Sequence, residues 1–531
     1  MHRKHVKFLA LLAIAALFVA GCGKEEKKAG PTAKTGGIFK MELSEPESLD
    51  PGLISTSEGI LVAHQMFDSL VTFDSKTAEA KPAGAASWTV SDAGKKITYK
   101  LKPNQVFSDG TALTAKNYAA GINRVAQKET ASDVAYHLSG IVGYKEVHDD
   151  GTAKEMSGVK VIDDSTLEVS LSAPDADFVI RSGHTIFSPI PANVTDWKAF
   201  NEQPVGNGPY MMKEKWQHDV SVTLVRNPKC VSSPKPYLDE IDIKLYADQT
   251  AAYKDFQAGA IDYVRVPPEQ IDAAKAAYPK GFIEQESTGL DYLVTNVETA
   301  PTNNVDFRRA LSMAIDRAAI VKAVFSGHRS PADDILPPVF PAHRKGACTY
   351  CVYDPVKAKE LLAKSGVNMA GKKLKISLNS GAGHETWIQA VGNSIKENLG
   401  IDYELNGLQP FGNYLKYLNG TGFTGIGRLA WGMDYPTPDN FLYPLFHGDS
   451  IGQDNYARYK GADALIATAR STTDAAARQK AYQAADDKIL DELPVIPFTF
   501  RRAVRVWNTE KFQGLTVDAF EEPTILTVSL K

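Results

Sequence analysis

Cysteine is scarce in this chain, with four residues in 531. Beyond the N-terminal region they stand at Cys230, Cys348 and Cys351. The spacing in Cys348-Thr-Tyr-Cys351 is that of a small disulfide loop, of a redox pair or of half a zinc site. No second Cys-x-x-Cys and no His-x-x-x-His accompanies it. We therefore expect a local disulfide, with Cys230 outside it, and no bound metal.

Signatures of catalysis are also missing. The glycine-rich turn Gly206–Pro209 lacks the lysine of a phosphate-binding loop. His384-Glu385 begins like a zinc-protease helix, but Ile388 stands where the second histidine would be. No Gly-x-Ser-x-Gly elbow occurs. We expect a protein that is not an enzyme and that carries no cofactor.

The sequence has no excess of positive charge, because its formal net charge is −4. A polyanionic partner requires a basic face, so we expect no nucleic acid among the partners. Hydrophobic residues make up 43% of the chain, which is ordinary for a folded protein. A single core rarely serves more than about 300 residues, so at least two lobes are expected.

The N-terminus has the layout of an export signal. A positive stretch, Arg3–Lys7, precedes the apolar run Phe8–Ala20, which is too short to span a bilayer as a helix. The run ends in Val19-Ala20-Gly21-Cys22, which resembles a bacterial lipobox. We expect residues 1–21 to be a lipoprotein signal peptide and Cys22 to be diacylated, the alternative being a plain signal peptide.

The composition after Cys22 predicts a flexible tether over residues 22–37. Lys, Glu, Gly, Ala, Pro and Thr dominate this segment without apolar periodicity, so it cannot bury a core. A diacyl anchor followed by a tether predicts an extracytoplasmic protein held at a membrane.

From Ile38 onward, alternating strand patterns are interspersed with helical patterns, which predicts a mixed α/β fold. Asp306 is expected to cap a helix through Phe325, Asp354-Pro355 to begin another that ends at Gly366, and Asp474 to begin a long one. Half-buried strands are expected at Ile97–Leu101, Thr166–Leu171, Ser221–Val225, Ile241–Leu245, Leu374–Leu378 and Ile401–Leu405.

One segment, Arg428–Leu442, is unlike a scaffold element. It combines aromatic residues, Pro436, Pro438 and Asp434 in a stretch too broken for a long helix. A loop with an Asx-type turn at Asp434 explains the pattern, and a ligand contact by this acid is the alternative.

In this segment and elsewhere the chain resembles the bacterial extracellular solute-binding proteins of family 5, the oligopeptide- and dipeptide-binding lipoproteins of ABC importers. The resemblance covers nearly the whole chain after the signal. The motifs that carry it are Glu47–Pro51, Phe67–Leu70, Phe107–Thr111, Val205–Tyr210, Asn303–Ala310 and Trp431–Leu442.

The resemblance implies a two-lobed periplasmic-binding-protein fold of type II, cluster C-like, with a discontinuous lobe I and an extra subdomain. It implies a monomer that closes on its ligand by a hinge and delivers it to membrane permease subunits. The implied parts are lobe I over 38–68, 206–289 and 491–531, the extra subdomain over 69–205, and lobe II over 290–490.

The resemblance also implies the ligand site. Leu429–Met433, including Gly432, matches the strand that pairs with a bound short peptide. Asp434, three residues after Trp431, matches the acid that binds the peptide α-ammonium. Trp431 and Tyr292 are expected nearby, with ordinary core packing as the alternative.

Two features set this chain apart from its relatives. Val134 stands where some relatives have a peptide-contacting tyrosine, and Tyr136 is shifted by two positions. The sequence also singles out no cation for a ligand carboxylate. Other ligands carried within the family are oligosaccharides, nickel chelates and haem, and a peptide could be a signal rather than a nutrient. The alternative from another functional class is a secreted hydrolase. The absence of a recognisable nucleophile with its base, and of a set of metal ligands, counts against it.

We predict that Cys22→Ser removes the lipid anchor. The variant should appear in the medium or periplasm instead of the membrane fraction, because a single residue carries both acyl chains. Fractionation followed by immunoblotting measures this, and membrane association equal to that of the wild type would overturn the lipoprotein prediction.

Overall fold

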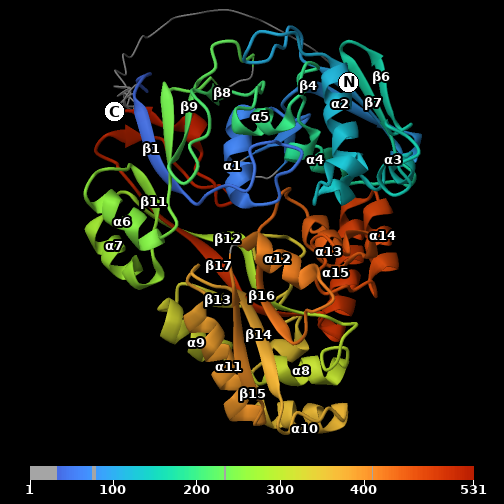
Figure 1. Ribbon diagram of the computed structural model, residues 1–531, viewed down its shortest axis with the longest axis vertical. Coiled ribbons are helices and arrows are strands. Elements are labelled where there is room, and N and C mark those ends of the chain that lie inside the picture. Colours follow the sequence, from blue (N-terminus) through green and yellow to red (C-terminus); the bar gives the residue numbers. More distant parts are fainter. Residues whose placement is uncertain (1–32, 75–78, 232–234, 410, 519) are drawn as a thin grey trace, which may run out of the picture.

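The computed structural model describes residues 33–531 except 75–78, 232–234, 410 and 519 (Figure 1). The expected signal peptide, Cys22 and most of the expected tether lie outside the described residues. The described chain has the expected mixed α/β fold, with one long sheet and three smaller sheets. Within this part of the chain, no helix combines the length and apolar character needed to cross a membrane.

An eleven-stranded sheet runs through both halves of the molecule, in the order β15-β14-β16-β12-β17-β11-β1-β10-β9-β8, with β13 paired to β17. Its strands are β1 (Ile38–Leu43), β8 (Tyr210–Met212), β9 (Ser221–Arg226), β10 (Glu240–Leu245), β11 (Tyr263–Arg265), β12 (Phe282–Thr295), β13 (Ser330–Pro331), β14 (Lys373–Asn379), β15 (Asp402–Leu408), β16 (Ile426–Trp431) and β17 (Val495–Trp507).

Strands β12 and β17 connect the two halves. They pair antiparallel from Phe282–Val506 to Val294–Val495, with irregular register between Glu286 and Leu290 and again after Asp291. Figure 1 shows them passing between the upper half, with β1, and the lower half, with β14 and β15. A β-bulge disrupts the ladder locally and bends the strand, so the connection between the two halves is irregular near Asp291.

A separate four-stranded sheet, β4-β5-β7-β6, lies in the upper part of the molecule with α2 packed against it. Its core includes Tyr99, Tyr118 and Leu167, all fully buried. The elements of this region are β2 (Val71–Phe73), β3 (Ala80–Pro82), β4 (Ala85–Ser91), β5 (Lys96–Leu101), α2 (Ala115–Ala126), α3 (Tyr144–His148), β6 (Val159–Asp163), β7 (Thr166–Ser170), α4 (Phe178–Arg181) and α5 (Trp197–Glu202).

Helix-end chemistry sets several boundaries as expected. Asp354 caps α10 (Pro355–Ser365), which ends at Gly366 with φ 67°. Asp474 caps α15 (Ala475–Glu492). All six expected strands are present, in β5, β7, β9, β10, β14 and β15. Short polar caps and period-two alternation are local signals, so the tertiary fold did not override them.

The prediction of one helix from Asp306 to Phe325 is wrong. Two helices occupy this segment, α8 (Val305–Met313) and α9 (Arg317–Phe325). Asn304, not Asp306, caps the first through the N–H of Phe307, and Asp316 caps the second through the N–H of Ala319. An internal Asp that satisfies a new set of N–H groups ends one helix and begins the next.

Some of the remaining helices pack on strands of the long sheet, and others pack on one another beside it (Figure 1). They are α1 (Ser57–Met66), α6 (Gln249–Gln257), α7 (Ile271–Ala277), α11 (Glu385–Leu399), α12 (Phe411–Asn419), α13 (Asp439–Phe446) and α14 (Asp463–Ser471), with the short strands β18 (Phe512–Gln513) and β19 (Ser529–Leu530) near the C-terminus.

Polar contacts join the β4–β7 region to the helical group α13–α15 beneath it. Arg181 of α4 donates hydrogen bonds to the carboxylates of Asp439 of α13, at 2.6 Å, and of Asp175, at 2.7 Å. Tyr136 donates 2.7 Å to Asp454, and Ser139 lies 2.6 Å from the hydroxyl of Tyr443. Except for the local Arg181–Asp175 pair, these contacts join residues more than 250 positions apart, so they link the two regions.

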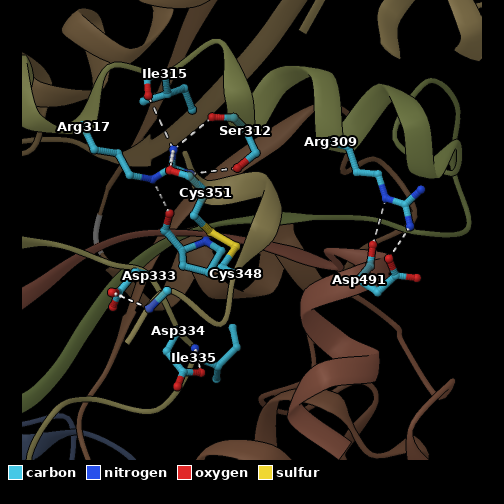
Figure 2. Close-up of a disulfide and its surroundings, with 12 residues drawn as sticks. Arg309, Ser312, Ile315, Arg317, Asp333, Asp334, Ile335, Cys348, Cys351 and Asp491 are labelled. Carbon is cyan, nitrogen blue, oxygen red and sulfur yellow. Dashed lines mark hydrogen bonds and ion pairs between the residues drawn. A yellow bond between two sulfur atoms is a disulfide. The ribbon is translucent and has the colours of Figure 1, made fainter. Parts of the chain in front are cut away.

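Cys348 and Cys351 are joined by a disulfide, with their Cα atoms 5.3 Å apart (Figure 2). Both residues are buried. Cys230 is also buried and lies outside this disulfide.

Arg317 ties this disulfide loop to the helices and to the sheet (Figure 2). Its guanidinium is buried and donates to carbonyl oxygens of Ser312, Ile315, Cys351 and Pro497 at 2.8–3.4 Å. Burial without a carboxylate partner lowers the pKa of Arg317 to about 9, so the group remains charged near pH 7. Carbonyl dipoles take the place of a counter-ion here.

We predict that Arg317→Met lowers the free energy of unfolding by roughly 3 kcal/mol, because several buried carbonyls lose their donor. Urea unfolding followed by circular dichroism measures the change. Lys322→Met, on the exposed face of the same helix α9, is the matched control and should unfold at the wild-type midpoint. Equal midpoints for both variants would contradict the assigned role of Arg317.

Candidate functional site

Asn440 fixes the shape of the segment that follows β16. Its side-chain oxygen accepts from the N–H of Asp434 at 2.8 Å, and its Nδ2 donates to Oδ2 of Asp434 at 2.9 Å. Its backbone carbonyl accepts from the indole of Trp431 at 2.8 Å. Asn440 is fully buried at the start of α13, so it holds both Trp431 and Asp434 from a rigid element.

One side of β16 is only partly paired. Strand β12 pairs with all six residues of β16, whereas β14 pairs only with Ile426 and Gly427. The carbonyl of Arg428 faces the β14 side, where it accepts from the hydroxyl of Tyr414 at 2.7 Å. Among the described residues no strand continues along this side beyond Gly427, so the edge is open from there.

The period of a strand identifies the backbone groups on this edge. Residues two apart present their N–H and C=O to the same side, so Ala430 and Gly432 share the side of the Arg428 carbonyl. The N–H of Met433 donates to the hydroxyl of Thr288, two residues before Leu290 of β12. Met433 therefore points its N–H toward β12, the side opposite to that of Ala430 and Gly432. Gly432 is exposed, and a Cβ placed on it would have nothing within 4 Å.

The residues expected at the site occupy two environments. Leu429, Met433 and Tyr292 are buried in one hydrophobic core, so their side chains support the strand. Trp431 is half-buried and packs against the same core. Gly432 is exposed, and Asp434, like Trp431, is partly accessible to solvent.

Asp434 lies half-buried beyond the end of β16. Burial raises its pKa to about 7, although the Asn440 donor and the nearby His64 of α1 act in the opposite direction. Burial likewise raises the pKa of the neighbouring Asp454 to about 7. His64 is engaged by Glu522 at 3.1 Å. Asp434 is therefore a recessed carboxyl that lacks an ion-pair partner among the described side chains.

A cationic cluster on the same strands was missed by the sequence analysis. Asp291 of β12, opposite Ala430, accepts from Arg329 at 2.6 Å, from Arg501 at 2.7 Å and from Arg428 at 3.3 Å. Three guanidinium groups around one carboxylate leave an excess of positive charge. Its members come from four separate segments of the chain. Of these residues, only Arg428, three positions before Trp431, lies in a segment that the sequence analysis had singled out.

A surface hollow of about 440 Å³ lies elsewhere, between α6, α7 and the end of β17, bounded by residues such as Phe256, Tyr278 and Trp507. None of the expected site residues lines it. It has no convergent charged groups like those at Asp434 or Asp291, so the strand edge remains the candidate site.

Comparison with known proteins bears on the family and the fold of the chain. The model of the bacterial extracellular solute-binding proteins, family 5 Middle, matches residues 79–453. The oligopeptide-binding protein OppA of Bacillus subtilis is 28% identical over 520 residues, 94% of each chain. Heme-binding protein A of Haemophilus influenzae is 27% identical over 525 residues, 93% of each chain.

Among solved structures, the murein tripeptide binding protein MppA of Escherichia coli matches with a TM-score of 0.84 and 25% identity, covering 94% of this chain and 98% of that one. The unliganded open form of MppA matches with a TM-score of only 0.69 over the same share of this chain. The arrangement of the halves therefore differs more from this open form than from the other MppA structure. The expected two-lobed type II fold is confirmed, and the chain belongs to the bacterial extracellular solute-binding proteins of family 5.

Proposed function

We propose that this protein is an extracytoplasmic lipoprotein, anchored through Cys22, that encloses a short peptide and delivers it to the membrane permease subunits of an ABC importer. The observation that carries the proposal is the open edge of β16 at Ala430 and Gly432, which ends at the recessed carboxyl of Asp434.

The open edge suits an extended peptide. A peptide that adds a strand there bonds through its main chain to the N–H and C=O groups of Ala430 and Gly432. Main-chain bonding gives affinity that does not depend on the ligand side chains. The buried positions Leu429 and Met433 keep the strand in register beneath the ligand.

The charges at the two ends of the edge suit a zwitterion. Asp434 accepts the α-ammonium, which supplies the ion-pair partner that the carboxyl lacks. The excess charge of Arg329, Arg428 and Arg501 attracts the carboxylate, or an acidic side chain, at the other end. A peptide bound in this sense runs antiparallel to β16.

Closure accounts for how the ligand is enclosed. The contacts of Arg181 with Asp439 and of Tyr136 with Asp454 lie between regions that a hinge at β12 and β17 separates. Opening breaks them and exposes the β16 edge, and ligand binding favours the closed state in which they form.

The decisive experiment combines Asp434→Asn with N-acetylation of one peptide. Either change alone should raise the dissociation constant by about two to four decades, because removing one partner of a buried charge pair costs roughly 3–5 kcal/mol. Making both changes should cost little more than one, since the pair is already broken. Calorimetry on the four combinations measures this.

Asp454→Asn is the matched control, since Asp454 is a neighbouring carboxyl with a similarly raised pKa. In that variant N-acetylation should still cost as much as in the wild type. Additive losses in Asp434→Asn would place the ammonium elsewhere. Failure of every peptide in a mixed-sequence library to bind the wild type would point to another ligand class.

A further inference from the structure

His137 is a buried side chain with unused hydrogen-bonding capacity. It is 1% exposed, and neither of its ring nitrogens has a hydrogen-bond partner among the described residues. Its ring lies 4.2 Å from that of Tyr136, 4.9 Å from that of His184 and edge-on to Tyr435. Burying an imidazole without hydrogen-bond partners costs free energy, so a bound ligand that contacts these nitrogens would offset that cost.

His184 and Asp434 converge on His137. One ring nitrogen of each histidine and one carboxylate oxygen of Asp434 lie within 4.8 Å of one another. The three residues come from different segments, after Val134, before the short turn at Thr185 and beyond β16. Two imidazoles and one carboxylate form a donor set that binds divalent metals of the zinc and nickel class.

We propose that His137, His184 and Asp434 form a binding site for one divalent cation of this class. Three protein ligands leave a fourth position for water or for a ligand atom. Ligand atoms in a tetrahedral site lie about 3.4 Å apart, so the three side chains move inward by a small amount when the cation binds. The proposal rests on this geometry and not on the nature of the transported solute.

The two histidines differ in the hydrogen bonds that they lose when a cation binds. His137 loses none, because its ring nitrogens have no partners among the described residues. His184 accepts at Nδ1 from the N–H of Ile186 at 3.2 Å, which places its proton on Nε2. Coordination through Nε2 requires the other tautomer and sacrifices this hydrogen bond, so His184 is the weaker ligand of the two.

The cation and a peptide ammonium use the same carboxylate. Asp434 cannot serve both fully, so zinc and a peptide should compete for the protein. The site also joins the region of β4–β7, with His137 and His184, to the segment after β16, so a bound cation stabilises the closed arrangement.

The test uses the full protein, stripped of metal by chelation and titrated with zinc chloride in competition with a chromophoric chelator. The wild type should bind one equivalent and show a higher melting temperature with zinc. His137→Phe and Asp434→Asn should each weaken zinc binding by more than about a hundredfold, since even second-layer changes at such sites cost about 10–100-fold. His184→Phe should cost less than His137→Phe.

His218→Phe is the control for adventitious surface binding, because His218 is half-exposed and lies between Glu45 and Glu202. It should leave the one-equivalent binding unchanged, and His137→Gln provides a second variant if the phenylalanine form does not fold. Peptide binding that survives in His137→Phe while zinc binding is lost separates this site from the proposed function. No stoichiometric zinc, or zinc binding that His218→Phe abolishes and His137→Phe retains, would overturn the proposal.

Discussion

The pairing of β12 with both β16 and β17 is the constraint on which the rest depends. Along one side β12 fixes the register of β16, and so the parity that turns Ala430 and Gly432 to the open edge. Along the other side it pairs with β17 through both halves, with irregular register near Asp291. The strand that fixes the register of the candidate site therefore also connects the two halves, so under the proposed function a ligand on β16 acts directly on the equilibrium between open and closed forms.

The sequence predicted those parts of the fold that short-range chemistry decides. Asp354 and Asp474 cap helices where expected because a cap needs only its own side chain and the next N–H groups. The failure at Asp306 has the same origin, since the apolar periodicity continues across Asp316 although the backbone does not. The course of the eleven-stranded sheet could not be predicted this way, because its neighbours lie hundreds of residues apart.

At the candidate site, the family resemblance pointed to the segment around Asp434, whereas the side chains that hold this segment in place were not predicted. The sequence singled out Asp434 and Trp431, whereas Asn440, which holds both, was only one polar residue in a broken stretch. The arginines around Asp291 and the convergence of His137 with His184 arise from tertiary contacts alone. A lone histidine in a sequence is seldom a ligand, and only the absence of hydrogen-bond partners marks His137 as different.

The two carboxylates on these strands show how charge is distributed along the edge. Asp291 is surrounded by three arginines, which hold its pKa far below its usual range against the effect of burial. Asp434 is given no arginine or lysine, and burial raises its pKa instead. Among the described side chains, one acid is thus left without an ion-pair partner, whereas the other is paired with three arginines. Under the proposed function, this uneven distribution of charge is what favours a zwitterion over a neutral solute.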